Sequence, residues 1–223
     1  MSHTDAKDFV DRARARSTAA AGARVISLDD LRDQQPVASP RWQLDDLVGR
    51  LVEVSGYGSG AAFTAVARLV LEAQCRNEPA AWLSLPGGSF FPPDLDACGI
   101  DLDALVVVRV RDTVAMVRAA DTLLRSGSFG LVLLDLGALA ELPMAVQGRL
   151  VGLAQRHDSA LVAMTHKPRD AASLGSIVSL RAEAVRERTR GGGFQVTVRA
   201  LKDKRRGPGW DQVFEAIPPA GQK

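Results

Sequence analysis

The chain has 223 residues, 46% of them hydrophobic, which suits one globular domain with a full core. Lys and Arg total 28 against 26 Asp and Glu, so the formal net charge of +2 excludes no class of partner. The two cysteines, Cys75 and Cys98, and the three histidines lack the spacing of a zinc site and the density of a disulfide scaffold. They predict reduced packing cysteines, no metal, and a cytoplasmic protein. The charged N-terminus predicts no secretory signal, and no apolar run is long enough to predict a membrane span.

Both ends of the chain differ in composition from its middle. Residues 4–17 carry charges at helical spacing, and two prolines follow at 34–40, so residues 1–40 are predicted to form an N-terminal helix and linker. Residues 41–217 are predicted to form a single domain, and 218–223 a C-terminal tail. The helix at 4–17 and the segment after Trp210 are candidate docking elements, the alternative being termini without a defined role.

The middle of the chain alternates between short apolar runs and amphipathic stretches. This order predicts βαβ units with a mainly parallel sheet. The β-branched run at 105–110 is typical of a central parallel strand, and Asp112 is predicted to cap the following helix, with Val114 facing inward. The predicted strands are 51–55, 80–85, 105–110, 130–135 and 160–165, the predicted helices are 62–76, 113–125 and 143–157, and a helical turn is predicted at 94–98.

The pattern changes after Pro168, where alternating residues and glycine turns replace helices. We expect antiparallel strands that extend the sheet, within 177–183, 194–201 and 210–217.

A glycine-rich turn joins the strand at 51–55 to the next helix, in the layout of a phosphate-binding loop. Phosphate-binding loops that bind nucleotides have the pattern G-x-x-x-x-G-K-[ST], in which the Lys reaches the phosphates and the Ser or Thr hydroxyl holds Mg²⁺. In this chain the last three positions of the pattern are Ala61, Ala62 and Phe63, which carry neither a charge nor a hydroxyl. We therefore predict that the protein is not an enzyme and binds no cofactor. A register shift would use the Thr64 hydroxyl, and a third interpretation is a tight turn alone. The loop residues are Gly56, Gly58, Ser59, Gly60, Ala61, Ala62 and Phe63.

From Gly49 to about Glu215 the chain resembles a RecA-type recombinase core. The similar pieces are Gly-Arg-Leu-Val-Glu-Val-Ser-Gly at 49–56, Gly-Ile-Asp-Leu-Asp-Ala-Leu at 99–105, the stretch from 119 to Asp135, and Val-Thr-Val-Arg-Ala-Leu-Lys-Asp-Lys at 196–204. The resemblance implies a RecA-type P-loop fold in which Asp135 is the remaining Walker B carboxylate. The family's catalytic Glu falls near Gly87, its Asn-Gln pair falls on Thr165 and His166, and the connections where recombinases hold DNA are short.

These departures make the chain more similar to the accessory proteins of bacterial mutagenesis cassettes, the ImuA group. That resemblance implies a non-catalytic adaptor in SOS-induced translesion synthesis, with an inactive polymerase-like partner (ImuB-like), an error-prone polymerase complex, and RecA or DNA as further partners. The alternative is a SulA-like inhibitor of the tubulin-like division protein.

The segment 181–206 holds nine basic residues against three acidic ones. It predicts weak, salt-dependent binding to DNA or to an acidic partner. The alternative is a solvated hairpin whose charges prevent edge aggregation. The candidate binding residues are Arg199, Lys202, Lys204, Arg205 and Arg206.

Other side chains near the glycine-rich turn have simpler interpretations. Asp135 is predicted to cap nearby backbone. Ser59 and His166 have the residue types of a nucleophile and its base, but the sequence offers no third group to orient the base, so we interpret the pairing as accidental. We expect Tyr57, Phe90 and Phe91 to form an apolar cluster over the former nucleotide site.

Overall fold

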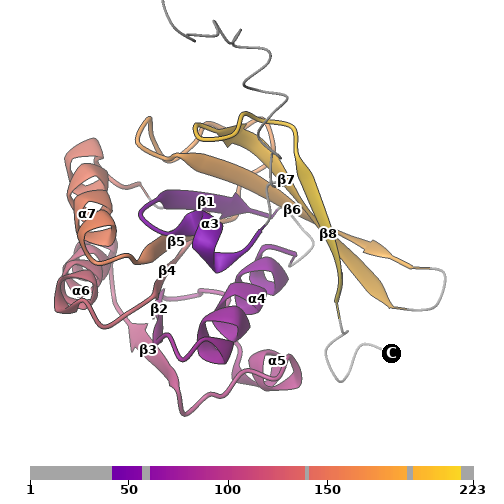
Figure 1. Ribbon diagram of the computed structural model, residues 1–223, viewed down its shortest axis with the longest axis horizontal. Helices are drawn as coiled ribbons and strands as arrows, with labels where there is room; N and C mark the ends of the chain where they lie inside the picture. Colours follow the sequence, from indigo (N-terminus) through magenta and orange to yellow (C-terminus); the bar gives the residue numbers. More distant parts are fainter. Residues whose placement is uncertain (1–41, 57–60, 139–140, 190–192, 217–223) are drawn as a thin grey trace, which may run out of the picture. The chain divides into compact units, whose positions relative to one another are not determined.

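The computed structural model describes residues 42–56, 61–138, 141–189 and 193–216 (Figure 1). The chain divides into two units, residues 1–39 and 40–223, and every described residue belongs to the second. The predicted helix at 4–17, the linker and the tail at 218–223 lie outside the described residues, and the predicted domain boundaries stay predictions.

The core of the fold is an eight-stranded sheet with the order β3-β2-β4-β5-β1-β6-β7-β8. Strands β1 to β5 run parallel to their neighbours, β6 pairs parallel with β1, and β7 and β8 continue the sheet antiparallel. This confirms the expected mixed, mainly parallel sheet. The strands are β1 Leu51–Ser55, β2 Ala80–Ser84, β3 Leu105–Arg109, β4 Leu131–Gly137, β5 Ala160–Thr165, β6 Leu180–Arg188, β7 Phe194–Asp203 and β8 Asp211–Ala216.

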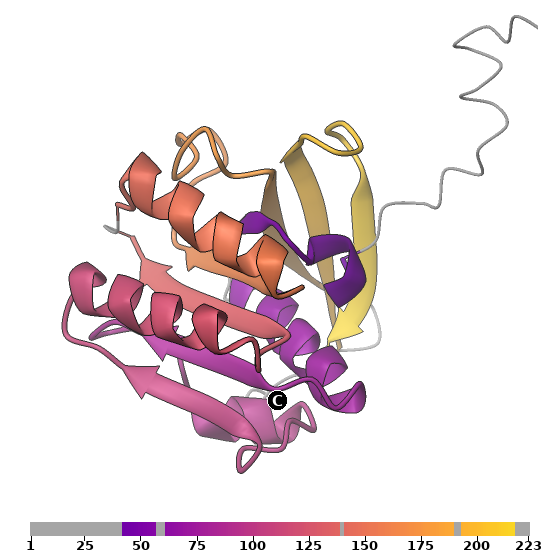
Figure 2. The same ribbon diagram turned by 60° about the vertical axis from the view of Figure 1, so that its left-hand side comes forward.

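Helices cover the parallel part of the sheet on both faces. One face packs against α3 (Leu44–Leu47), α4 (Ala61–Cys75) and α5 (Pro92–Ala97). Figure 2 shows α6 (Thr113–Ser126) and α7 (Met144–Arg156) side by side over the other face. Because both faces are covered, β1, β2 and β5 are buried throughout, as their unbroken apolar runs require.

Local signals account for the boundaries of α6. The Asp112 carboxylate accepts from the Ala115 amide at 2.7 Å, which confirms the predicted cap. Gly127 ends the helix at a φ of 69°, where a glycine avoids strain. Asp121 accepts from Arg149 of α7 and from Arg125, and these bonds lower the pKa of Asp121 to about 2.

Three predictions were wrong in detail. The run at 105–110 forms the edge strand β3, where Val106 and Val107 are 41% and 36% exposed. A β-branched run fits any strand, and whether that strand lies at the centre depends on its neighbours. Val114 is 63% exposed rather than inward, because it lies at the solvent side of the first turn. Cys75, at the end of α4, is exposed rather than packed, and both cysteines are free.

A buried ion pair fastens the end of β7 to the start of β1. Asp203 Oδ1 accepts from Arg50 Nη2 at 2.6 Å, and the two side chains are 1% and 3% exposed. The Arg205 amide and the Trp210 indole also donate to this carboxylate, at 2.9 and 3.1 Å. Three donors thus compensate the burial of this carboxylate, as a buried charge requires.

Candidate functional site

The carboxyl ends of the parallel strands meet at one edge of the sheet, where α/β proteins of this class bind ligands. The residues that follow β1 reach this edge at Gly56. A Cβ on Gly56 would lie 3.1 Å from the backbone nitrogen of Ala62, so a larger residue here would require the helix start to move by a few tenths of an ångström. Gly58, Ser59, Gly60 and Tyr57 lie outside the described residues.

The first residues of α4 face the core. Ala61 and Ala62 are 0% and 2% exposed. The centroid of the half-buried Phe63 ring lies 5.6 Å from that of Trp82 in β2, and the Phe90 ring lies edge-on to Trp82 at a centroid distance of 5.5 Å. Phe63, at the sequence position where the phosphate-binding pattern has a hydroxyl, therefore packs against an aromatic side chain of the core. Phe91, predicted to join this cluster, is 53% exposed.

The loop after β2 lies directly over Asp135. The carboxylate is fully buried, and its Oδ2 accepts from the Ser89 amide at 2.6 Å, which is a backbone contact of the kind expected for this residue. Burial raises the pKa of Asp135, against the opposing effects of the Ser89 amide, the Trp82 indole and His166. The indole acts from nearby without the geometry of a hydrogen bond. This carboxylate is therefore held inside the protein rather than presented to solvent.

Gly88 makes that close approach of the loop feasible. A Cβ at Gly88 would overlap Ser84 Oγ and lie 2.7 Å from Asp135 Oδ2. We expect Gly88→Ala to lower the free energy of unfolding by about 1–3 kcal/mol, because the loop must move away from the carboxylate. Chemical denaturation measures this change. Gly152→Ala in α7 is the control, because a Cβ there meets nothing within 4 Å. Equal stability of the two variants would contradict the tight approach.

His166 has a different partner from the one considered in the sequence. Its Nε2 lies 3.1 Å from Ser89 Oγ, while Ser59 lies outside the described residues. No carboxylate is hydrogen-bonded to this imidazole among the described residues. The contact joins the end of β5 to the loop that covers Asp135.

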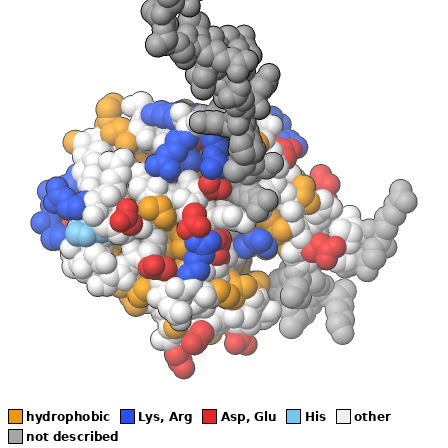
Figure 3. All heavy atoms as spheres, viewed as in Figure 1, with side chains coloured by type: hydrophobic (Ala, Val, Ile, Leu, Met, Phe, Trp, Pro, Cys, Tyr) orange, Lys and Arg blue, Asp and Glu red, His pale blue; other side chains and the backbone are white. Residues whose placement is uncertain are grey.

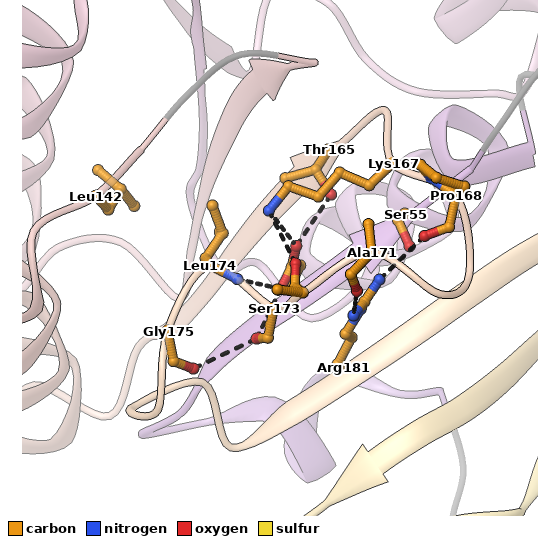
Figure 4. Close-up of polar contacts among 12 residues, drawn as sticks. Ser55, Leu142, Thr165, Lys167, Pro168, Ala171, Ser173, Leu174, Gly175 and Arg181 are labelled. Carbon is orange, nitrogen blue, oxygen red and sulfur yellow. Dashed lines mark hydrogen bonds and ion pairs between the residues drawn. The ribbon is translucent and has the colours of Figure 1, made fainter.

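A buried carboxylate that the sequence analysis did not single out holds the β5–β6 loop, residues 166–179 (Figure 4). Glu53 of β1 is fully buried, and its Oε1 lies 3.2 Å from Lys167 Nζ and 3.3 Å from Thr165 Oγ1. Its Oε2 accepts from Ser173 Oγ at 2.9 Å and from the Leu174 amide at 2.8 Å. The signal available in the sequence is a single charge inside an apolar strand, which predicts a partner without naming it.

Two further buried side chains bind the same loop through its backbone. Arg181, 7% exposed, donates to the carbonyls of Ala171, Pro168 and Arg169, the last two at 3.2 and 3.4 Å. Gln147 of α7 donates to the Leu174 carbonyl at 2.9 Å. The loop is therefore fixed from three sides by side chains of the core.

Four of the five predicted binding residues bond to groups of the protein itself. Arg199 donates to both Asp211 carboxylate oxygens, at 3.0 and 3.1 Å. Burial, then nearby Lys204, lowers the pKa of Lys202. The remaining three side chains bond to the protein itself: Lys204 to the Ser176 carbonyl, Arg205 to the Val48 carbonyl, and Arg206 to Asp46. Figure 3 shows acidic side chains interspersed among basic ones on the face that carries α4.

Two absences concern the described part of the chain. Within the ranges given above, no group of three or more His, Cys, Asp and Glu side chains is placed to bind a metal. None of the helices in those ranges combines the length and apolar character that crossing a bilayer requires.

No protein-family model matches the chain. Curated proteins named RecA do match it: one from Lactobacillus delbrueckii subsp. bulgaricus is 28% identical over 128 residues, which is 52% of this chain and 38% of the relative. RecA of Lactobacillus acidophilus is 27% identical over the same length, covering 35% of that protein. The chain is a distant relative of RecA. It spans little more than a third of the length of the relatives it matches, and the sheet described above is compatible with a RecA-like core.

Proposed function

We propose that this protein is a non-catalytic, RecA-like accessory protein of SOS-induced DNA repair and translesion synthesis. It acts as an adaptor that binds an inactive, ImuB-like polymerase homologue within an error-prone polymerase complex, with RecA or DNA as further partners. The observation that carries the proposal is the start of α4, where Ala61 and Ala62 are buried and Phe63 stacks on Trp82.

The chemistry of phosphoryl transfer supports the first half of the proposal. Transfer requires a cation against the β- and γ-phosphates and a metal held by a hydroxyl and a carboxylate. Here Ala62 supplies no charge and Phe63 no hydroxyl, and the one matching carboxylate, Asp135, is bonded to the Ser89 amide under a loop. A relative that has lost these groups retains only its surfaces for function.

Nucleotide handling tests the non-catalytic part. We expect the full chain to release no phosphate from ATP with Mg²⁺ above the buffer rate, and to show no heat of ATP binding by calorimetry. An active RecA protein, assayed in parallel, is the positive control. Turnover by the purified chain would overturn the proposal.

Complex formation tests the adaptor part. We expect the full chain to co-elute with an ImuB-like polymerase homologue from the same genome in size-exclusion chromatography. Co-sedimentation with the tubulin-like division protein is the comparison. Binding to the division protein instead of the polymerase homologue would favour the SulA-like alternative.

A further inference from the structure

Strands β6, β7 and β8 extend the sheet beyond the two helices that cover its parallel part. Figure 2 shows α6 and α7 over the parallel strands and not over this three-stranded extension. The face that turns toward the side of α6 and α7 is therefore free of helices among the described residues. We call it the open face. Strand register assigns it Glu183, Val185, Glu187, Gln195, Thr197, Arg199, Asp211, Val213 and Glu215.

A largely apolar row, two valines with a threonine between them, crosses the middle of the open face. Val185, Thr197 and Val213 are paired across the three strands. Neither valine belongs to the two hydrophobic clusters of the core, and Val213 is 50% exposed. A row of this kind offers a partner contact area that the fold itself does not use.

Carboxylates lie on both sides of this apolar row. On one side, Gln195 stands between Glu187 and Glu215, which have no ion pair within the described structure. On the other side, Arg199 is paired with Asp211, and Glu183 lies 3.9 Å from Arg169. The two glutamates lie in one cross-strand row with only Gln195 between them, so a cation placed there would attract both.

Arg186 and Arg188 of β6 do not offset this charge, because they lie on the opposite face, whereas the third arginine of the strand, Arg181, is bonded to the β5–β6 loop. Arg186 and Arg188 stack on the Phe194 ring, at 4.6 and 5.7 Å from its centroid. Alternation along β6 places Glu183 and Glu187 on the open face and both arginines behind it.

A hollow continues the open face at the end where Arg199 meets Asp211. It has a volume of about 720 Å³, and the β5–β6 loop forms one wall. That wall is preformed, since Arg181 binds three of the loop's carbonyls. The hollow is lined by Arg169, Asp170, Arg199, Leu201, Pro208 and Asp211, among others.

We propose that the open face and this hollow bind an extended, lysine- or arginine-bearing segment of a partner protein. The segment's cations pair with Glu187 and Glu215, its apolar residues pack on the row of Val185 and Val213, and one side chain enters the hollow. Charge complementarity selects a basic segment and repels polyanions such as DNA from this face. The inference rests on the proposed adaptor function and names the chemistry of the partner.

Binding of a synthetic peptide of alternating lysine and valine to the full chain tests the inference, with amide chemical shifts as the readout. We expect shifts in β6–β8, and we expect the double variant Glu187→Lys, Glu215→Lys to weaken binding about tenfold or more. The matched control is Asp96→Lys, Asp103→Lys, which makes the same change in net charge at exposed positions elsewhere. The control should bind the peptide nearly as well as the unmodified chain.

Several outcomes would overturn the inference. These are an absence of peptide binding, shifts confined to other elements, equal weakening in both double variants, or equal binding of a glutamate–valine peptide. Shifts of β6–β8 on adding single-stranded DNA would also overturn it. Because the peptide replaces the partner, a negative result here leaves the polymerase co-elution experiment to judge the adaptor function separately.

Discussion

Asp203→Ala is expected to lower the free energy of unfolding by about 3–5 kcal/mol, because it leaves the Arg50 guanidinium buried without its partner. Urea denaturation measures the change. Asp211→Ala is the matched control, since it breaks the Arg199–Asp211 pair, whose side chains are each 38% exposed. That loss should stay below about 1 kcal/mol. Similar values for the two variants would contradict a special role for the buried pair.

The lowered pKa of Asp203 makes the stability contributed by its ion pair depend on pH. Burial alone would raise the pKa of Asp203, but the Arg205 amide, Arg50 and Trp210 outweigh it and hold the pKa below its usual 3.8. Because the folded-state pKa is the lower one, this contribution is present above the unfolded value and is lost as pH falls through the folded value. We therefore expect the difference in unfolding free energy between the unmodified chain and Asp203→Ala to shrink below about pH 3.8. A difference that stayed constant into that range would contradict this assignment.

Glu53→Ala is expected to lower the free energy of unfolding by about 2–4 kcal/mol, because it strands the Lys167 ammonium and several donors of the β5–β6 loop. It should also speed hydrogen exchange of loop amides such as Leu174 more than exchange of β4 or β5 amides. Hydrogen exchange followed by NMR separates the two effects. Glu53→Gln keeps the shape and one acceptor, so it should cost less. Uniform acceleration across the sheet would contradict a local role for Glu53.

Local chemistry explains which features the sequence predicted well. The Asp112 cap depends on a side chain and an amide three residues apart, and the strand–helix alternation depends on short runs of apolar residues. The antiparallel pairs β6–β7 and β7–β8 are likewise marked by alternation and glycine turns, whereas the parallel pairing of β6 with β1 was not predicted. Each of these signals lies within a short stretch of chain.

Contacts distant in the chain explain what could not be predicted. Arg50 and Asp203 are 153 positions apart, and nothing near either residue identifies the other. The edge position of β3 depends on which strands pair with β2, and the role of Glu53 depends on a loop more than 100 residues later. At the candidate site, the absence of a charge at position 62 can be seen in the sequence, whereas the close approach of Gly88 to Asp135 can be seen only in the structure.

The segregation of charge along β6 also helps to specify how the sheet assembles. Side chains alternate strictly between faces, so a slip of one position between β6 and β7 would exchange every inward and outward residue. Glu183 and Glu187 would then point into the packing against α4, while Ala182 and Ala184 would turn to water. A slipped register would therefore cost free energy in two ways, because it buries two carboxylates and exposes two alanines that pack in the core. Glu183 and Glu187 therefore help to specify the register in which β6 pairs with β7.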